Sequence, residues 1–150
     1  MNTAAEYALS IAQGLSMLDE IHYDWWKNDV ATTVDRIREV GGDDDHLVAL
    51  ANFLENEYAG ETDDIGTAYL ELALDVWTDI QWRWNQQDIK SVTALVTSGG
   101  PHATVKYGGY ETDVLVEVTW GSEVATRWVA CAPVANVMSV IWDNAEEALR

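Results

Sequence analysis

The chain has 150 residues, 48% of them hydrophobic, and its 26 Asp and Glu against 8 Lys and Arg give a formal net charge of −18. A field this negative repels phosphate backbones and argues against direct binding of DNA or RNA. Eight Trp and six Tyr supply the large apolar anchors that acidic disordered tails lack, so we expect a single folded domain over 1–150.

The cellular compartment is inferred from the lack of a disulfide pair, a signal-peptide pattern and a membrane-spanning pattern in the sequence. A lone cysteine, Cys131, excludes a disulfide within the chain. The opening residues show no basic segment of a signal peptide, and no apolar run approaches the ~20 residues of a membrane span. We therefore expect a soluble, cytoplasmic protein.

Helical periodicity dominates the first part of the chain. Apolar residues gather on one arc in a helix over 3–26, with Asn2 or Thr3 as its cap, and again over 30–40 and 44–58. Gly41 and Gly42 end the second of these helices.

A fourth helix is predicted after the loop at 59–62. Thr62 or Asp63 caps it, and it runs to about Asn85, because apolar residues occupy one broad arc at 100° per residue. The helical part of the chain thus covers about 1–88.

After Asp88 the apolar period changes from 3.6 to 2. Four short strands are predicted over 92–97, 103–107, 112–120 and 123–130, separated by glycine-containing turns, and this spacing favours an antiparallel meander. Pro133 then opens a closing helix over about 133–149. The predicted fold is α+β: an N-terminal bundle of about four helices, a small four-stranded antiparallel meander over about 91–130, and a C-terminal closing helix.

The stretch G-G-D-D-D-H, residues 41–46, is the first candidate site. A calcium loop needs alternating oxygen ligands and a glutamate well downstream, whereas these carboxylates are consecutive. Two glycines followed by Asp and an apolar-periodic segment are typical of a helix start. We therefore expect Asp43 or Asp44 to accept from free backbone N–H groups, with the other acids stabilising the positive end of the helix.

The predicted fourth helix provides the second candidate. Glu71, Asp75 and Asp79 repeat at i, i+4 and i+8, and Asp64 and Trp82 fall on the same outward ridge. Like charges at this spacing destabilise a helix, and an exposed Trp among charges is typical of an interface hot spot. An ordinary solvated face, with Trp82 folded onto a neighbouring element, is the alternative.

Isolated reactive residues give no catalytic pattern. Ser98 and His102 flank the turn G-G-P and, like Cys131, have no partner at a fixed spacing, and His22 lies in an apolar arc. No catalytic residue, cofactor or metal is expected.

The strand and turn T-A-L-V-T-S-G-G-P-H, with the later V-E-V-T-W-G, resembles a segment of small acidic proteins of bacteriophages and mobile elements. The resemblance covers about a third of the chain. It implies an accessory role, of which anti-defence (anti-CRISPR or antirestriction) activity is one form, and it supplies no catalytic residue.

These observations lead to a functional hypothesis: a phage or mobile-element inhibitor whose acidic, DNA-mimicking surface occupies the basic groove of a CRISPR–Cas effector or restriction enzyme in the host cytoplasm. The expected contact residues are the ridge, the Asp triplet and the acids between them: Asp64, Glu71, Asp75, Asp79, Trp82, Asp43, Asp44, Asp45, Glu55, Glu57, Glu61 and Asp63.

Two alternatives remain open at this point. Salt adaptation of a halophile's structural or housekeeping protein would give the same acidic composition, with the acids spread evenly over the surface. A metal-dependent hydrolase would need three or four carboxylates or histidines that converge in space.

A homodimer through Leu9 and Met17, on the polar side of the first helix, is also open.

Overall fold

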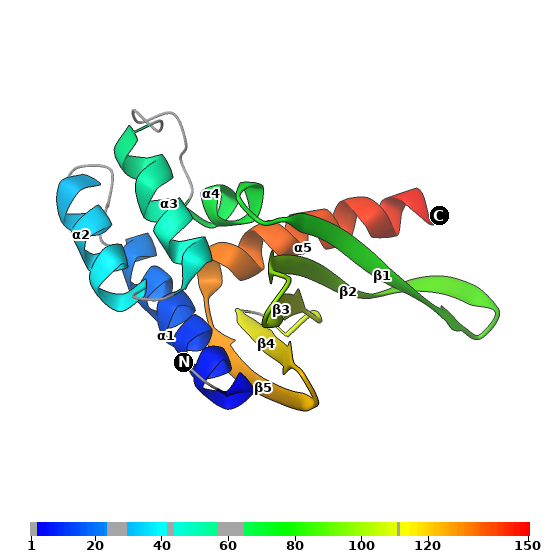
Figure 1. Ribbon diagram of the computed structural model, residues 1–150. Coiled ribbons are helices and arrows are strands. Elements are labelled where there is room, and N and C mark those ends of the chain that lie inside the picture. Colours follow the sequence, from blue (N-terminus) through cyan, green and yellow to red (C-terminus); the bar gives the residue numbers. More distant parts are fainter. Residues whose placement is uncertain (1–2, 24–29, 42–43, 57–64, 111) are drawn as a thin grey trace.

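The computed structural model describes residues 3–23, 30–41, 44–56, 65–110 and 112–150. Within these ranges three helices and a short fourth one precede five strands and a long closing helix (Figure 1). The elements are α1 (Ala4–Tyr23), α2 (Val30–Gly41), α3 (Asp45–Asn56), α4 (Ile65–Glu71), β1 (Asp75–Arg83), β2 (Gln86–Thr97), β3 (His102–Tyr107), β4 (Asp113–Trp120), β5 (Glu123–Ala130) and α5 (Ala132–Ala148).

The strands form one antiparallel sheet in which each strand pairs with the next one along the chain, in the order β1-β2-β3-β4-β5. Two of the connections are two-residue hairpins, one at Trp84 and Asn85 and one at Gly121 and Ser122. The predicted meander is therefore present, but it has one strand more than expected.

The predictions of a long fourth helix and of a four-stranded sheet are wrong. α4 ends at Glu71, and Asp75–Arg83 pairs along its whole length with β2. This segment is rich in the β-branched and aromatic residues that favour strands. Val76 and Ile80, four residues apart, fit a helical period of 3.6 and a strand period of 2 equally well, so their spacing could not distinguish the two structures.

The predicted four-helix bundle is also wrong, for a related reason. The shortened α4 packs mainly against α5, and only a few residues of it meet α1 and α3. α2 packs against α1 and α3, whereas α4 lies mainly with α5, so the four helices do not form one bundle ahead of the sheet.

The starts of the first and third helices agree with the predictions within one residue, and positions 24–26 of the first predicted helix lie outside the described residues. Thr3 caps α1: its Oγ1 accepts from the backbone N–H of Glu6 at 3.1 Å and donates to Oε1 of Glu6, also at 3.1 Å. Asn2, the other predicted cap, lies outside the described residues, as do the last two positions of the helix predicted over 44–58.

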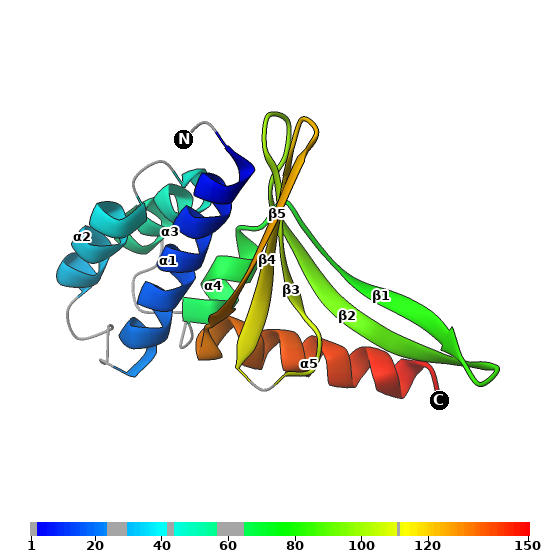
Figure 2. The same ribbon diagram turned by 90° about the horizontal axis from the view of Figure 1, so that it is seen from below.

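One face of the sheet forms the core against the helices. α1 contacts β4 and β5, whereas α5 contacts chiefly β2, and Figure 2 shows α5 running along the sheet. Successive strand residues point to opposite faces. In β4, Val114, Val116 and Val118 are therefore fully buried in the core, while Leu115 and Glu117 lie half-buried on the other face.

A carboxylate ties α1 to the start of α5. The residue before α5, Cys131, makes no side-chain cap, and Pro133 lies in the first turn as expected. Oδ1 of Asp19 accepts from the backbone N–H of Ala132 at 2.7 Å, so a different helix supplies the acceptor that the first turn needs. None of the helices in the described ranges has the length and apolar character needed to cross a bilayer.

Candidate functional site

The twelve predicted contact residues fall into two groups. Five of them lie outside the described residues: Asp43, Glu57, Glu61, Asp63 and Asp64. The structure places the other seven on three elements or their ends: Asp44, Asp45, Glu55, Glu71, Asp75, Asp79 and Trp82.

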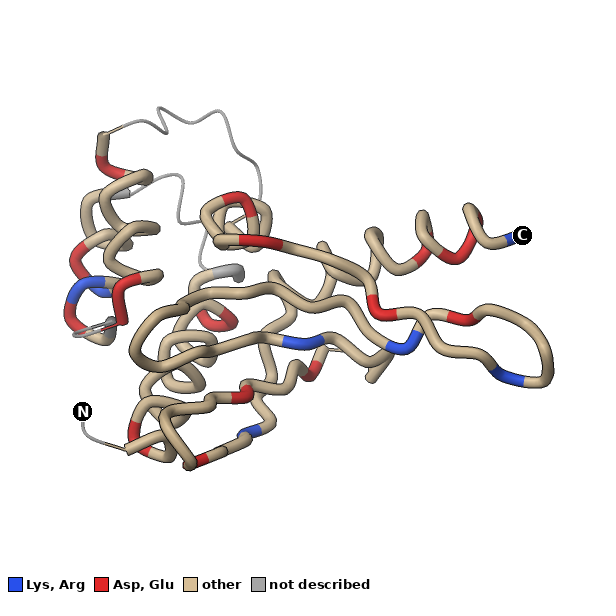
Figure 3. The backbone as a smooth tube through the Cα atoms, turned by 45° about the vertical axis from the view of Figure 1, so that its right-hand side comes forward, with Lys and Arg blue, Asp and Glu red and all other residues tan. Residues whose placement is uncertain are grey.

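The structure does not contain the helical ridge. Glu71 is the last residue of α4, while Asp75, Asp79 and Trp82 lie on the strand β1, where residues four apart are separated by two full pleats. Figure 3 shows acidic segments on helices and strands alike rather than in one row. The geometric basis for mimicry of a DNA strand by this segment is thereby removed.

Asp79 is held within the sheet by three hydrogen bonds. Its Oδ1 accepts from Nε1 of Trp77 at 3.0 Å, and its Oδ2 accepts from the hydroxyls of Ser91 at 2.5 Å and Thr93 at 2.6 Å. Burial raises the pKa of Asp79, but these hydrogen bonds and nearby Lys106 lower it by more, so the net pKa is below its ordinary value. The carboxylate therefore stays ionised, and most of its acceptor capacity is used.

The interpretation of G-G-D-D-D-H as a helix start is confirmed for Asp44. This residue is only 3% exposed and precedes α3, and its Oδ1 accepts from the backbone N–H groups of His46 at 3.0 Å and Leu47 at 3.3 Å. Burial raises the pKa of Asp44 to about 6, although both N–H groups oppose that shift. Among the described residues, no three His, Cys, Asp or Glu side chains converge to hold a metal ion.

His46, the last residue of the G-G-D-D-D-H stretch, is buried next to this cap, and no separate role was predicted for it from the sequence. Its Nε2 donates to the backbone carbonyl of Tyr69 at 2.8 Å, and its ring packs edge-on against the Tyr69 ring with centroids 4.3 Å apart. Burial lowers the pKa of His46 to about 4, so the ring is neutral near pH 7. It joins α3 to α4.

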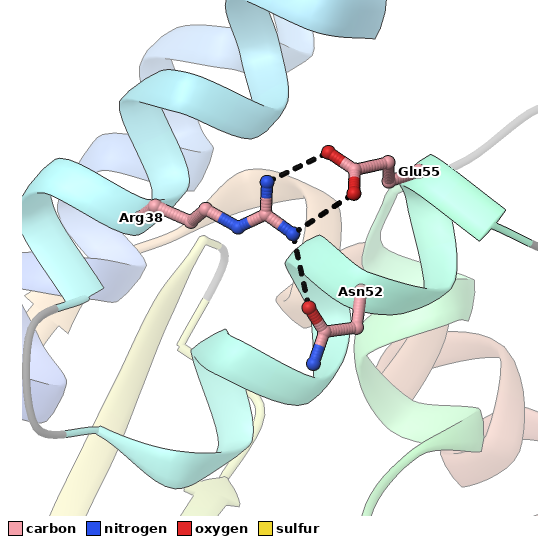
Figure 4. Close-up of polar contacts among 3 residues, drawn as sticks. All are labelled: Arg38, Asn52 and Glu55. Atoms are coloured by element: carbon pink, nitrogen blue, oxygen red, sulfur yellow. Dashed lines mark hydrogen bonds and ion pairs between the residues drawn. The ribbon is translucent and has the colours of Figure 1, made fainter.

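The predicted contact residue Glu55 has a cationic partner. Figure 4 shows the guanidinium of Arg38 on α2 reaching across to α3, where it contacts both oxygens of Glu55, at 2.7 and 3.3 Å, and Oδ1 of Asn52 at 3.0 Å. The hydrogen bonds from Arg38 lower the pKa of Glu55 below its ordinary value. Glu55 therefore contributes much less negative potential to the surface than an isolated carboxylate would.

The charge is nevertheless divided unevenly between the two halves of the chain. Residues 1–74, which include α1–α4, hold 16 Asp and Glu against 3 Lys and Arg, a net charge of −13. Residues 75–150, which include the sheet and α5, hold 10 against 5, a net charge of −5.

The tip of the β1–β2 hairpin exposes two tryptophans. Trp82 is 73% exposed and Trp84 is 91% exposed. Trp84 and Asn85 form the two-residue turn, with φ of 53° and 64°, as a type I′ turn requires at both central positions. Asn and Gly suit such a turn, whereas a left-handed backbone costs another residue about 1–2 kcal/mol. Sequence reasoning found Trp82 and missed Trp84, because the segment was assigned to a helix.

Comparisons with protein-family models, with curated proteins and with solved structures each found no match.

Proposed function

We propose that this protein binds another protein, using the β1–β2 hairpin tip as an anchor and its negative field to select a basic surface. Within this class, we propose a phage or mobile-element inhibitor of a host defence complex that handles nucleic acid, such as a CRISPR–Cas effector or a restriction enzyme. Such complexes hold polyanions in channels lined by Lys and Arg.

The observation that carries this proposal is the position of Trp84. Its indole is 91% exposed and its φ is 53°, so it adds little packing to the fold and occupies a backbone conformation that disfavours it. Folding stability alone gives no reason for tryptophan at this position. Tryptophan is enriched among the residues that dominate binding energy at interfaces, and insertion into a partner's pocket would compensate for the unfavourable turn.

The charge distribution supports the choice of a basic partner. A net charge of −18 accelerates association with a positively charged surface and disfavours acidic partners. The excess in residues 1–74 lies in the half of the chain that precedes the hairpin. In this arrangement the field steers the encounter and the indoles supply the short-range contact, so no regular row of carboxylates is required.

The test is a DNA-cleavage assay with a panel of purified CRISPR–Cas effectors and restriction enzymes in about 50 mM KCl. We expect the wild-type protein to inhibit at least one of them. The double variant Trp82→Ala/Trp84→Asn keeps a turn-compatible residue at 84, and it should weaken inhibition by about 30-fold or more, the effect of losing one hot spot of ~2 kcal/mol.

The matched control is Trp128→Ala, which removes an exposed tryptophan (56%) from β5, away from the hairpin tip. It should inhibit as the wild type does. The proposal fails if no enzyme in the panel is inhibited, or if the control loses as much inhibition as the hairpin variant.

A further inference from the structure

The face of the sheet opposite the core contains a cavity of about 570 Å³. Residues from all five strands line it, so the sheet curves around this space. Its volume falls within the range of ~300–1,000 Å³ that is usual for small-molecule sites. The lining residues are Thr78, Asp79, Ile80, Lys90, Ser91, Lys106, Gly108, Leu115 and Trp128.

Two cationic side chains line this cavity. The chain has only three lysines, and Lys90 and Lys106 both line it, while Lys27 lies outside the described residues. Lys106 lies 3.7 Å from a carboxylate oxygen of Glu117, and Lys90 makes no ion pair with any other described residue. In a protein of net charge −18, two lysines at one cavity create a local site for an anion.

A β-bulge accounts for the position of Lys90. Asp79 pairs with Ser91 and Ile80 pairs with Ile89, so Lys90 has no opposite residue on β1. Successive residues of a regular strand point to opposite faces, yet Lys90 and Ser91 both line the cavity. Bulges re-aim side chains in this way and are frequent beside binding sites.

The acidic group in the cavity is already satisfied by protein donors. The three hydrogen bonds to Asp79, from Trp77, Ser91 and Thr93, fix this carboxylate as part of the wall. Glu117 and Asp79 partly neutralise Lys106, so Lys90 is the main cation at the cavity and suits a ligand with one oxyanion group. The lysines, unlike Asp79, can turn their donors to that group.

The part of the lining that β4 and β5 supply is apolar and aromatic. Trp128 lies beside Leu115, its pairing partner in β4. The ring of Tyr110 packs edge-on against the Trp128 indole, with centroids 5.6 Å apart, which restrains its orientation. An indole held in this way offers a stacking surface to a planar ring.

We propose that this cavity binds a small planar aromatic molecule that carries one oxyanion group, either a carboxylate or a phosphate. The ring packs against Trp128 and Leu115, and the oxyanion pairs with Lys90 and Lys106. The site is separate from the hairpin tip and does not depend on the proposed inhibition of a defence complex.

Calorimetric titration of the full chain tests this proposal, with adenosine 5′-monophosphate and indole-3-acetate as probes. Adenosine and indole-3-acetamide are the matched neutral molecules, and inorganic phosphate lacks a ring. We expect at least one anionic probe to bind tenfold or more tightly than its neutral counterpart and than phosphate. The better of the two anionic probes then identifies the oxyanion as phosphate or carboxylate.

Variants connect the binding to the residues. Lys90→Gln changes an exposed side chain and should weaken the preferred probe about fivefold or more, and Trp128→Ala should do the same. Arg127→Gln is the control, because Arg127 pairs with Val116 and therefore lies on the core face of the same strand as Trp128. The proposal is overturned if neither anion binds at millimolar concentration, if the neutral probes or phosphate bind equally well, or if Arg127→Gln weakens binding as much as Lys90→Gln.

Discussion

Asp44 and His46 lie two residues apart at the start of α3, and burial moves their pKa values in opposite directions. Burial raises the pKa of Asp44 to about 6 and lowers that of His46 to about 4. The corresponding unfolded values are 3.8 and 6.5. Asp44 therefore contributes stability that is complete below pH 3.8 and lost as the pH rises through 6. His46 contributes stability that is complete above pH 6.5 and lost as the pH falls through 4.

The two contributions oppose each other between about pH 4 and 6, and each is worth about 3 kcal/mol. Replacing one residue should reveal the pH dependence of stability that the other residue contributes. Asp44→Asn keeps a good helix cap and removes the acidic titration. Relative to the wild type, its free energy of unfolding should therefore rise by about 3 kcal/mol between pH 4 and 6. Urea denaturation of both proteins at several pH values in this window measures the difference.

The complementary variant is His46→Gln, which keeps a donor for the Tyr69 carbonyl. The free energy of unfolding of this variant, relative to the wild type, should fall over the same window. Equal pH dependence in all three proteins would show that neither group titrates as its burial requires.

At the scale of elements, the contact between α4 and α5 depends on the absence of one side chain. A Cβ placed on Gly66 would overlap the backbone carbonyl oxygen of Pro133, in the first turn of α5. Gly66→Ala should lower the free energy of unfolding by about 2–3 kcal/mol, since the overlap is with backbone and outweighs the better helix propensity of alanine. Guanidinium denaturation should give a lower midpoint with an unchanged slope.

Gly100→Ala is the control for this substitution. A Cβ at Gly100 meets no atom within 4 Å, and its φ is outside the left-handed region. This variant should remain within about 0.5 kcal/mol of the wild type. An equally small change for Gly66→Ala would contradict the close approach of α4 to α5.

Some secondary-structure elements could be predicted from local sequence and others could not. The segments 30–40, 103–107 and 123–130 each have one dominant period, and the structure has the expected element at each of them. Between Asp75 and Arg83 the side chains satisfy both periods, and pairing with β2 decides in favour of a strand. That pairing is a long-range property, which no local window of sequence contains.

The candidate sites also divide into those that local sequence predicts and those that depend on long-range strand pairing. Asp44 as a cap depends on local sequence and was predicted. Trp82 was predicted as a contact residue because charged residues surround it. The exposed turn position of Trp84 and the lysine-lined cavity could not be predicted, because both depend on Asp75–Arg83 being a strand. The cavity combines residues from five strands that only the fold brings together, and so it had no sequence signal beyond the scarcity of lysine.

At the scale of the whole molecule, the net charge of −18 has opposite effects on folding and on binding. Self-repulsion destabilises the folded chain, and salt screens it, with a Debye length of about 10 Å at 0.1 M and about 3 Å at 1 M. The described residues nevertheless form a continuous apolar core that includes Leu15, Leu50, Val116 and Met138. We therefore expect the protein to be folded in 50 mM KCl, with a Tm that rises by a few degrees and levels off below about 1 M KCl.

Thermal melts in KCl, with sucrose as an excluded solute that does not screen charge, separate screening from solvent effects. Over the same range of KCl, inhibition of a basic target should weaken steeply, because steered association falls with ionic strength. A chain that unfolds without molar salt would instead identify the acidity as salt adaptation, with the acids acting as a hydrated coat. Opposite trends in Tm and in inhibition are the result that a binding function requires, since the same carboxylates that repel one another attract the partner.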